Sequence, residues 1–117
     1  MTTPKHDRVA LLQGTLDLIV LRTLLAGTQH GQGIATAIQR TSREALLVDH
    51  GSLYPALQRL EAKKWIRAEW GTTSNNRAAR FYELTALGRK QLVREVSEWK
   101  KLTRAVALIL DSEAAGG

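Results

Sequence analysis

The chain has 117 residues and a mass of 13.0 kDa, a length that suits one hydrophobic core and hardly two. Lys and Arg outnumber Asp and Glu by 17 to 11, and the resulting net charge of +6 favours an anionic partner such as nucleic acid or an acidic membrane. There is no cysteine, which excludes disulfide scaffolds, thiolate zinc sites and cysteine nucleophiles.

Two segments bear on membranes and export. The most apolar stretch, Leu16 to Ala26, contains Asp17 and Arg22 and is shorter than the roughly 20 residues that a membrane-spanning helix needs. The first eight residues, MTTPKHDR, lack the apolar segment of an export signal. We therefore expect no transmembrane helix and a cytoplasmic location.

Two helices are predicted in the first half of the chain. The first has Thr15 as its N-cap and continues with apolar residues spaced three and four apart to Leu25. Residues 28–31, with the sequence TQHG, are predicted to form a turn. A second, shorter helix is expected from about Gln32 to Thr41.

The segment GSLYPALQRLEAKKW predicts a third helix. Pro55 has no N–H and is tolerated best in a first turn, so we expect the helix to start near Gly51 or Ser52, with Ser52 as N-cap, and to reach about Lys63. Its buried face is predicted to carry Leu53, Leu57 and Leu60. The opposite face is predicted to carry Pro55, Gln58, Arg59 and Ala62, flanked by Ser52 and Tyr54.

A β-hairpin is predicted next. The alternating segments Trp65 to Trp70 and Arg80 to Leu84 read as two strands, and residues 71–79, GTTSNNRAA, supply turn-forming residues between them. Both tryptophans of the first strand are expected to pack against the hairpin. Arg77 lies at its tip and Arg80 beside it.

A long helix is predicted to follow, with Thr85 as N-cap and an end near Asp111. Roughly 26 residues at about 1.5 Å each reach about 39 Å, more than the core of so small a domain needs. A partner helix on an apolar seam is therefore expected, and the tail from Ser112 is expected to fray. The seam is predicted to contain Leu92, Val96, Trp99, Leu102, Val106 and Ile109.

This order of elements predicts a mainly α fold with a β-hairpin: a winged helix-turn-helix domain over residues 1–85, followed by a C-terminal dimerisation helix and tail over residues 86–117. In helix-turn-helix proteins the recognition helix enters the DNA major groove, and basic side chains around it contact phosphates. Residues 51–85 carry +3 of the net charge of +6, so the surplus is largest where such a module meets DNA. This placement favours double-stranded DNA over a membrane as the partner.

Six runs of the sequence also resemble the PadR family of bacterial transcriptional regulators, in particular its members with a short C-terminal segment. The runs are GTLDLIVLRTL, HGQGIATAI, GSLYPALQRLEAKKWI, EW, RFYELTALGRKQL and EVSEWK, and the resemblance spans about Leu12 to Lys100. It implies a homodimeric winged-helix protein, usually a repressor, whose C-terminal helix contacts its twin. In some relatives an aromatic small molecule binds near the dimer interface and relieves repression. Gln32 and Lys64 depart from the family pattern, which often has an aromatic residue and a glycine there.

Six residues are expected to contact DNA. The hydroxyl groups of Ser52 and Tyr54 suit phosphate at the start of a helix, whereas Gln58 and Arg59 have the donors and acceptors to read base edges. The remaining two, Arg77 and Arg80, suit phosphate beside the wing. The alternatives are that Ser52 only caps the helix and that Tyr54 packs its ring against the hairpin. The other four side chains would then be ordinary solvated surface residues.

Trp99 has two readings, as one wall of an aromatic effector site or as apolar packing in the dimer interface. A second interpretation of the whole chain is a winged-helix adaptor that binds a protein partner without specific DNA binding; an exposed apolar patch on the third helix would favour it. His6, His30 and His50 are scattered, and no catalytic or metal-ligand pattern is present. We therefore expect no enzyme activity, no metal and no cofactor.

Overall fold

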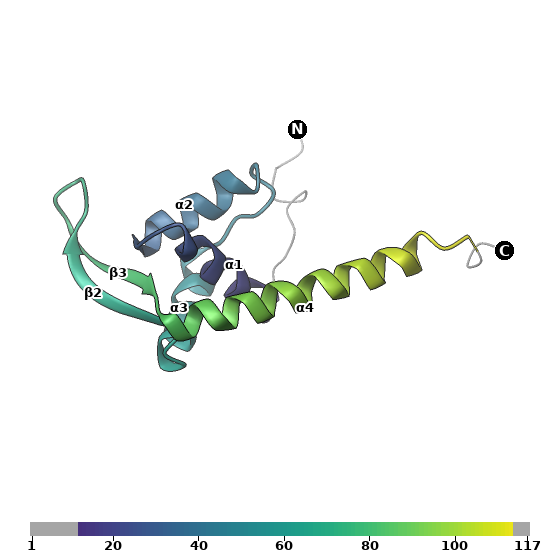
Figure 1. Cartoon of the computed structure of the whole chain (residues 1–117). Coiled ribbons are helices and arrows are strands. Elements are labelled where there is room, and N and C mark those ends of the chain that lie inside the picture. Colours follow the sequence, from purple (N-terminus) through teal and green to yellow (C-terminus); the bar gives the residue numbers. More distant parts are fainter. Residues whose placement is uncertain (1–11, 114–117) are drawn as a thin grey trace, which may run out of the picture.

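The computed structural model describes residues 12–113, which form four helices and three strands (Figure 1). In chain order these are α1 (Gln13–Leu25), β1 (Gln29–His30), α2 (Gly31–Thr41), α3 (His50–Ala62), β2 (Ile66–Thr72), β3 (Ala78–Leu84) and α4 (Ala86–Leu110). The N-terminal segment inspected for an export signal and most of the tail predicted to fray lie outside the described residues. Within residues 12–113, no helix combines the length and the apolar character that crossing a bilayer requires.

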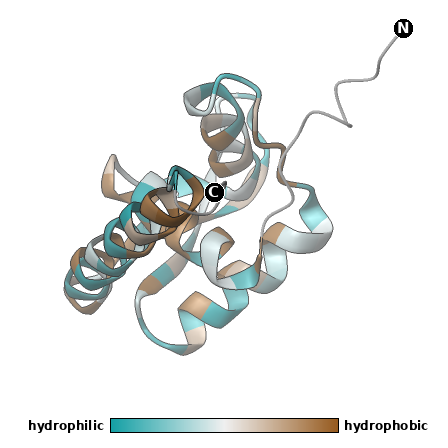
Figure 2. Ribbon diagram, turned by 90° about the vertical axis from the view of Figure 1, so that its right-hand side faces the viewer, coloured by the Kyte–Doolittle hydropathy of each residue, from teal (hydrophilic) through white to brown (hydrophobic). Residues whose placement is uncertain are grey.

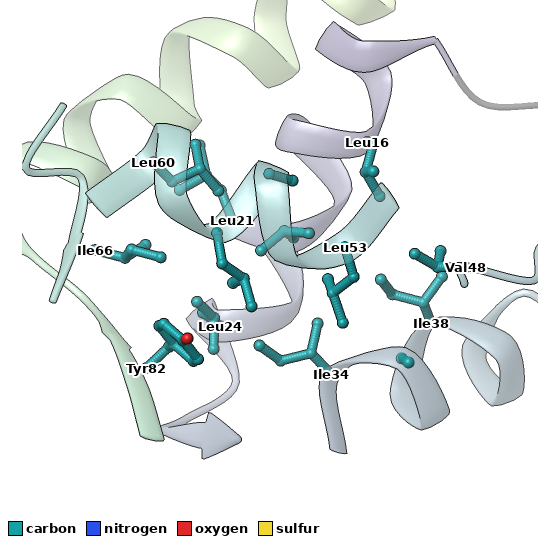
Figure 3. Packing of buried hydrophobic residues seen from close by; sticks show 14 of the residues in the cluster. Leu16, Leu21, Leu24, Ile34, Ile38, Val48, Leu53, Leu60, Ile66 and Tyr82 are labelled. Atoms are coloured by element: carbon teal, nitrogen blue, oxygen red, sulfur yellow. The ribbon is translucent and has the colours of Figure 1, made fainter. Parts of the chain in front are cut away.

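The core lies between α1, α2 and α3 and is closed by the sheet and the first turns of α4 (Figure 3). Helix α1 is central, because it contacts the other three helices and β3. The predicted buried face of α3 is confirmed: Leu53, Leu57 and Leu60 are at most 1% exposed, and Ala56 joins them. Apolar residues at helical spacing thus determine which side of α3 faces the core. The opposite side of the helix is left exposed.

Two predicted helix starts are wrong. Helix α1 begins at Gln13, so Thr15 lies inside its first turn instead of capping it. Helix α3 begins at His50, because the Asp49 carboxylate accepts a hydrogen bond from the backbone N–H of Ser52 at 2.8 Å and caps the helix three residues before the expected N-cap, Ser52. Pro55 consequently lies in the second turn, on the exposed side of the helix, where water can reach the carbonyl that lacks its donor.

The hairpin is longer than predicted. Strands β2 and β3 pair antiparallel from Ile66 opposite Leu84 to Thr72 opposite Ala78, which leaves only residues 73–77 as the loop. The predicted turn at residues 28–31 is also partly wrong, because β1 pairs with β3 and makes a sheet of order β1-β3-β2. Two residues are too few to show the alternation that marks a strand.

The C-terminal helix α4 begins as predicted. Thr85 is its N-cap, and the Thr85 hydroxyl accepts a hydrogen bond from the backbone N–H of Gly88 at 3.0 Å. The first turns pack on α1, where Leu92 is buried and Val96 is half-buried. Residues 97–113 are all exposed, and Figure 1 shows that this part of α4 extends away from the domain.

Candidate nucleic-acid interface

A cavity of about 410 Å³ lies between the start of α2, the outward side of α3 and the β2–β3 hairpin, which we call the wing. Three of the six residues expected to contact DNA line this helix–wing cleft, namely Tyr54, Gln58 and Arg80. The complete lining is His30, Gly31, Gln32, Tyr54, Gln58, Glu61, Trp70, Ala78, Ala79, Arg80 and Tyr82. The fold therefore brings together side chains from α3 and the wing that are far apart in the sequence.

Tyr54 is held at the junction of α2 and α3. Its ring meets the ring of His50 edge to face, with centroids 5.5 Å apart, and it remains 41% exposed. Its hydroxyl lies so close to Gly31 that a Cβ there would be 2.6 Å from the oxygen. Because Nε2 of His50 also lies 3.0 Å from Oε1 of Gln32, the starts of α2 and α3 are joined beside Tyr54. The hydroxyl thus sits at a helix N-terminus, where backbone N–H groups attract anions.

Arg59 does not project outward as predicted. Its guanidinium donates two hydrogen bonds to Asp17 of α1, from Nη2 to Oδ1 at 2.6 Å and from Nε to Oδ2 at 3.3 Å. The Arg59 side chain is 28% exposed and that of Asp17 only 11%. This bidentate pair fastens α3 to α1, so Arg59 serves the packing of α3 in this structure.

Arg80 lines the helix–wing cleft but also has a partner within it. Its Nη2 donates to Oε2 of Glu61 on α3 at 2.9 Å, which ties the wing to α3. The same guanidinium lies 5.9 Å from the ring centre of Tyr82. Burial raises the pKa of the Tyr82 hydroxyl above its usual value of 10.0, the nearby Arg80 opposes that shift, and the ring remains neutral in the physiological range.

Ser52 and Arg77 are exposed and do not line the cleft. Ser52 lies in the first turn of α3, and Arg77 lies in the loop of the wing, where its backbone N–H donates to the Thr73 hydroxyl. Trp65 is half-buried beneath the ammonium group of Lys63, which lies 4.7 Å from its ring centre. Trp70, by contrast, is 71% exposed, so the prediction that it packs against the hairpin is wrong.

The predicted seam of α4 divides into two parts. Leu92 belongs to the core of its own domain and is only 4% exposed, which removes it from the surface open to a partner. The C-terminal part of the seam is exposed to solvent, and Figure 2 shows apolar segments continuing along the extended part of α4. The exposed members are Trp99, Leu102, Val106 and Ile109.

A second cavity adjoins this helix. It has a volume of about 540 Å³ and lies between α1, α2 and α4. Leu18, Ile19, Ile38 and Val96 contribute apolar walls, and Lys100 is its last residue along α4. Residues 12–113 contain no cluster of three or more histidine, aspartate or glutamate side chains that could hold a metal ion.

The family can now be decided. The model of the transcriptional regulator PadR-like family matches residues 20–94, which include α2, α3, the wing and the first turns of α4. This chain belongs to the PadR-like family of transcriptional regulators. A curated relative from Lysinibacillus sphaericus, described as an uncharacterized protein, is 30% identical over 104 residues, which cover 89% of this chain and 95% of the relative.

Solved structures of transcriptional regulators match the architecture over most of the chain. A transcriptional regulator from Clostridium thermocellum is 27% identical with a TM-score of 0.75, over 86% of this chain and 96% of that one. A PadR family transcription regulator from Clostridium difficile is 25% identical with a TM-score of 0.70, over 81% of this chain and 97% of that one. The winged-helix fold with a long C-terminal helix is therefore confirmed.

Several residues of the interface were not found from the sequence. Asp17 and Glu61 carry the two ion pairs that hold α3, but they lie 42 and 19 residues from their arginine partners, so no local spacing marks them. Asp49 could have been found, since an aspartate three residues before Ser52 is a common capping pattern. The exposure of Trp70 follows from the length of the wing, which extends past the core.

Proposed function

We propose that this PadR-like protein is a cytoplasmic, homodimeric repressor that binds a partly palindromic DNA operator and blocks a promoter. Two copies of α3 and two wings, one from each protomer, contact the two half-sites. A two-fold dimer requires an operator of the same symmetry. No catalytic activity forms part of the proposal.

The observation that carries the proposal is the helix–wing cleft. Tyr54 and Gln58 on α3 face the same cavity as Arg80 on the wing, which suits a DNA strand passing between helix and hairpin. Apart from Tyr54 and Pro55, the exposed residues of α3 are polar or small: His50, Gly51, Ser52, Gln58 and Ala62. An adaptor that binds protein would instead present an apolar patch on this helix, so the composition of the face favours DNA.

The experiment begins with genomic fragments retained by the purified protein, which identify an operator. Replacing Tyr54 by Phe removes only the hydroxyl, and we expect the dissociation constant for that operator to rise about tenfold, the effect of losing one good phosphate contact of about 1 to 3 kcal/mol. Gel shifts at several salt concentrations measure it, and wild-type binding should weaken steeply as salt rises. Equal affinity of Tyr54→Phe and wild type would reject the Tyr54 contact. If the purified protein retained no genomic fragment, the proposed function itself would be rejected.

An aromatic effector is the finer part of the proposal. Trp99 is 42% exposed on the α4 surface, one residue before Lys100 at the end of the 540 Å³ cavity. An effector that stacks on Trp99 would change its fluorescence, whereas pure dimer packing would not respond to added ligand. Titrating chemically varied aromatic compounds while recording emission separates the two readings.

A further inference from the structure

Trp70 is the most exposed aromatic side chain of the described residues. It lies on β2 and alternates onto the same face of the strand as Ile66, which is 2% exposed, yet Trp70 is 71% exposed. The reason is position: β2 continues past the core, so no helix covers the sheet at this point. A large indole is thus presented to solvent on the side of the wing that faces α3.

The surroundings of Trp70 are those of a DNA-facing surface. Its cross-strand neighbour is Arg80, and both line the helix–wing cleft with Tyr54 and Gln58. The adjacent wing residues Ala78 and Ala79 are small and leave the indole accessible. Residues 71–79 contain one basic and no acidic side chain, and the Glu61 carboxylate in the cleft is already paired with Arg80.

We propose that Trp70 is a DNA-contacting residue of the wing, whose ring packs against the deoxyribose–phosphate backbone at the edge of the minor groove. This inference rests on the proposed operator binding. An indole suits the site because its flat face covers the apolar side of a sugar, while its Nε1–H is a donor only and phosphate oxygens are acceptors only. Proteins that enter the minor groove commonly place apolar side chains there beside basic ones.

A protein partner fits the same surface less well. Interfaces between proteins centre on a desolvated apolar cluster. Around Trp70 the cleft offers Gln58, Glu61 and Arg80, and the other exposed wing residues are mainly small or polar. An indole beside hydrogen-bonding groups such as Gln58 and Arg80 matches a sugar–phosphate chain, which alternates apolar and charged surface.

The test compares three variants on the operator fragment recovered with wild-type protein, and on a shuffled duplex of equal length. For Trp70→Ala we expect a rise of about tenfold in the dissociation constant, and for Trp70→Phe, which keeps a ring, less than about threefold. Leu108→Ala is the matched control, because Leu108 is 76% exposed on α4 and away from the cleft; its affinity should equal that of wild type. All three should melt like wild type, since neither side chain belongs to the core.

The salt dependence distinguishes this contact from a lost charge. Tryptophan releases no counterion, so Trp70→Ala should keep the wild-type slope of affinity against salt, whereas loss of one phosphate-bound arginine lowers it by about 1. In a Trp65→Phe/Trp99→Phe protein whose gel shift on the operator matches that of wild type, DNA should also shield the remaining indole from acrylamide quenching. The inference would be overturned if Trp70→Ala bound the operator as tightly as wild type, or if Trp70→Ala and Trp70→Phe lost affinity equally. It would also be overturned if Trp70→Ala lowered the slope of affinity against salt, or if DNA left acrylamide quenching unaltered. If wild-type protein retained no fragment, operator binding itself would fail first.

Discussion

Two arginines that the sequence marks for DNA prove to have carboxylate partners in the same chain. Arg59 is held by Asp17 and Arg80 by Glu61, and both pairs end on α3. The first joins α3 to α1 and the second joins α3 to the wing. Arginine's planar fork makes such pairs geometrically specific, so they orient α3 between its two neighbours. Positioning α3 is therefore a role of these two arginines.

The Arg59 pair leads to a prediction about stability. Arg59→Ala leaves the poorly exposed Asp17 carboxylate without its two donors, and we expect the free energy of unfolding to fall by about 2 kcal/mol. Arg67→Ala is the control, because both side chains of the Arg67–Glu83 pair are exposed, 71% for Arg67 and 46% for Glu83. Its free energy of unfolding should change by less than about 0.5 kcal/mol. Urea denaturation at matched protein concentration measures both.

Operator binding separates the two roles of Arg59. If Arg59 positions α3, Arg59→Ala loses stability, and its affinity for DNA falls only as far as the recognition helix shifts. Wild-type stability combined with a large loss of affinity would show instead that Arg59 leaves Asp17 to contact DNA. That result would restore the prediction made from the sequence and contradict the positioning role.

At the scale of elements, the start of α4 is fixed to the connection between α3 and β2 by hydrogen bonds to two backbone carbonyls. The Thr85 hydroxyl donates to the Lys64 carbonyl at 2.7 Å, and the Thr85 N–H donates to the Trp65 carbonyl at 3.0 Å. Gly88 passes directly over the same Trp65 carbonyl, where a Cβ would collide with the oxygen and carbon. The direction in which α4 leaves the domain depends on this close approach.

Gly88→Ala should therefore destabilise the fold. The added Cβ meets backbone, which cannot rotate away as a side chain can, so we expect a loss of about 2 kcal/mol or more. Gly14→Ala is the matched control: Gly14 also lies in the first turn of a helix, but a Cβ there meets nothing within 4 Å, and alanine should stabilise α1 slightly. Thermal melts of the two variants should move in opposite directions, and parallel shifts would contradict the packing argument.

The elements could be predicted from the sequence because their signals are local. The spacing of Leu53, Leu57 and Leu60 defined the buried face of α3, and Thr85 marked the start of α4. The ion pair between Arg59 and Asp17 joins residues 42 positions apart, and β1 pairs with residues of β3 that are about 52 positions away. Only the folded chain brings such residues together. For the candidate site, three residues predicted from the sequence, Tyr54, Gln58 and Arg80, line the cleft. Neither the acidic partners of the arginines nor the exposure of Trp70 was predicted.

At the scale of the whole molecule, α4 is out of proportion to its own domain. The chain measures 61 × 42 × 21 Å along its principal axes, and the exposed part of α4 accounts for much of the long dimension (Figure 1). Trp99, Leu102, Val106 and Ile109 are exposed along that part, although a monomer gains nothing from an apolar surface there. A second copy would cover it, and two copies would also supply the pair of recognition helices that a palindromic operator needs.

The proposed dimer can be tested with two glutamates placed on opposite sides of α4. Val106 lies on the proposed seam, and Leu108 is about 200° further around the helix, so the two variants carry the same new charge on opposite faces. Two-fold symmetry puts two copies of each charge into one dimer. In Val106→Glu both carboxylates would be buried without partners, a cost of several kcal/mol, and each 1.4 kcal/mol weakens association about tenfold.

We therefore expect wild-type protein and Leu108→Glu to elute as dimers at micromolar concentration and Val106→Glu as a monomer, as measured by size-exclusion chromatography with light scattering. The monomer should remain folded, because Val106 lies beyond the core that Leu92 and Val96 close. Operator affinity should fall with it, since one recognition helix and one wing provide only half of the contacts. A monomeric wild type, or dissociation by both glutamates alike, would contradict the seam and leave the extension of α4 to be explained by another partner.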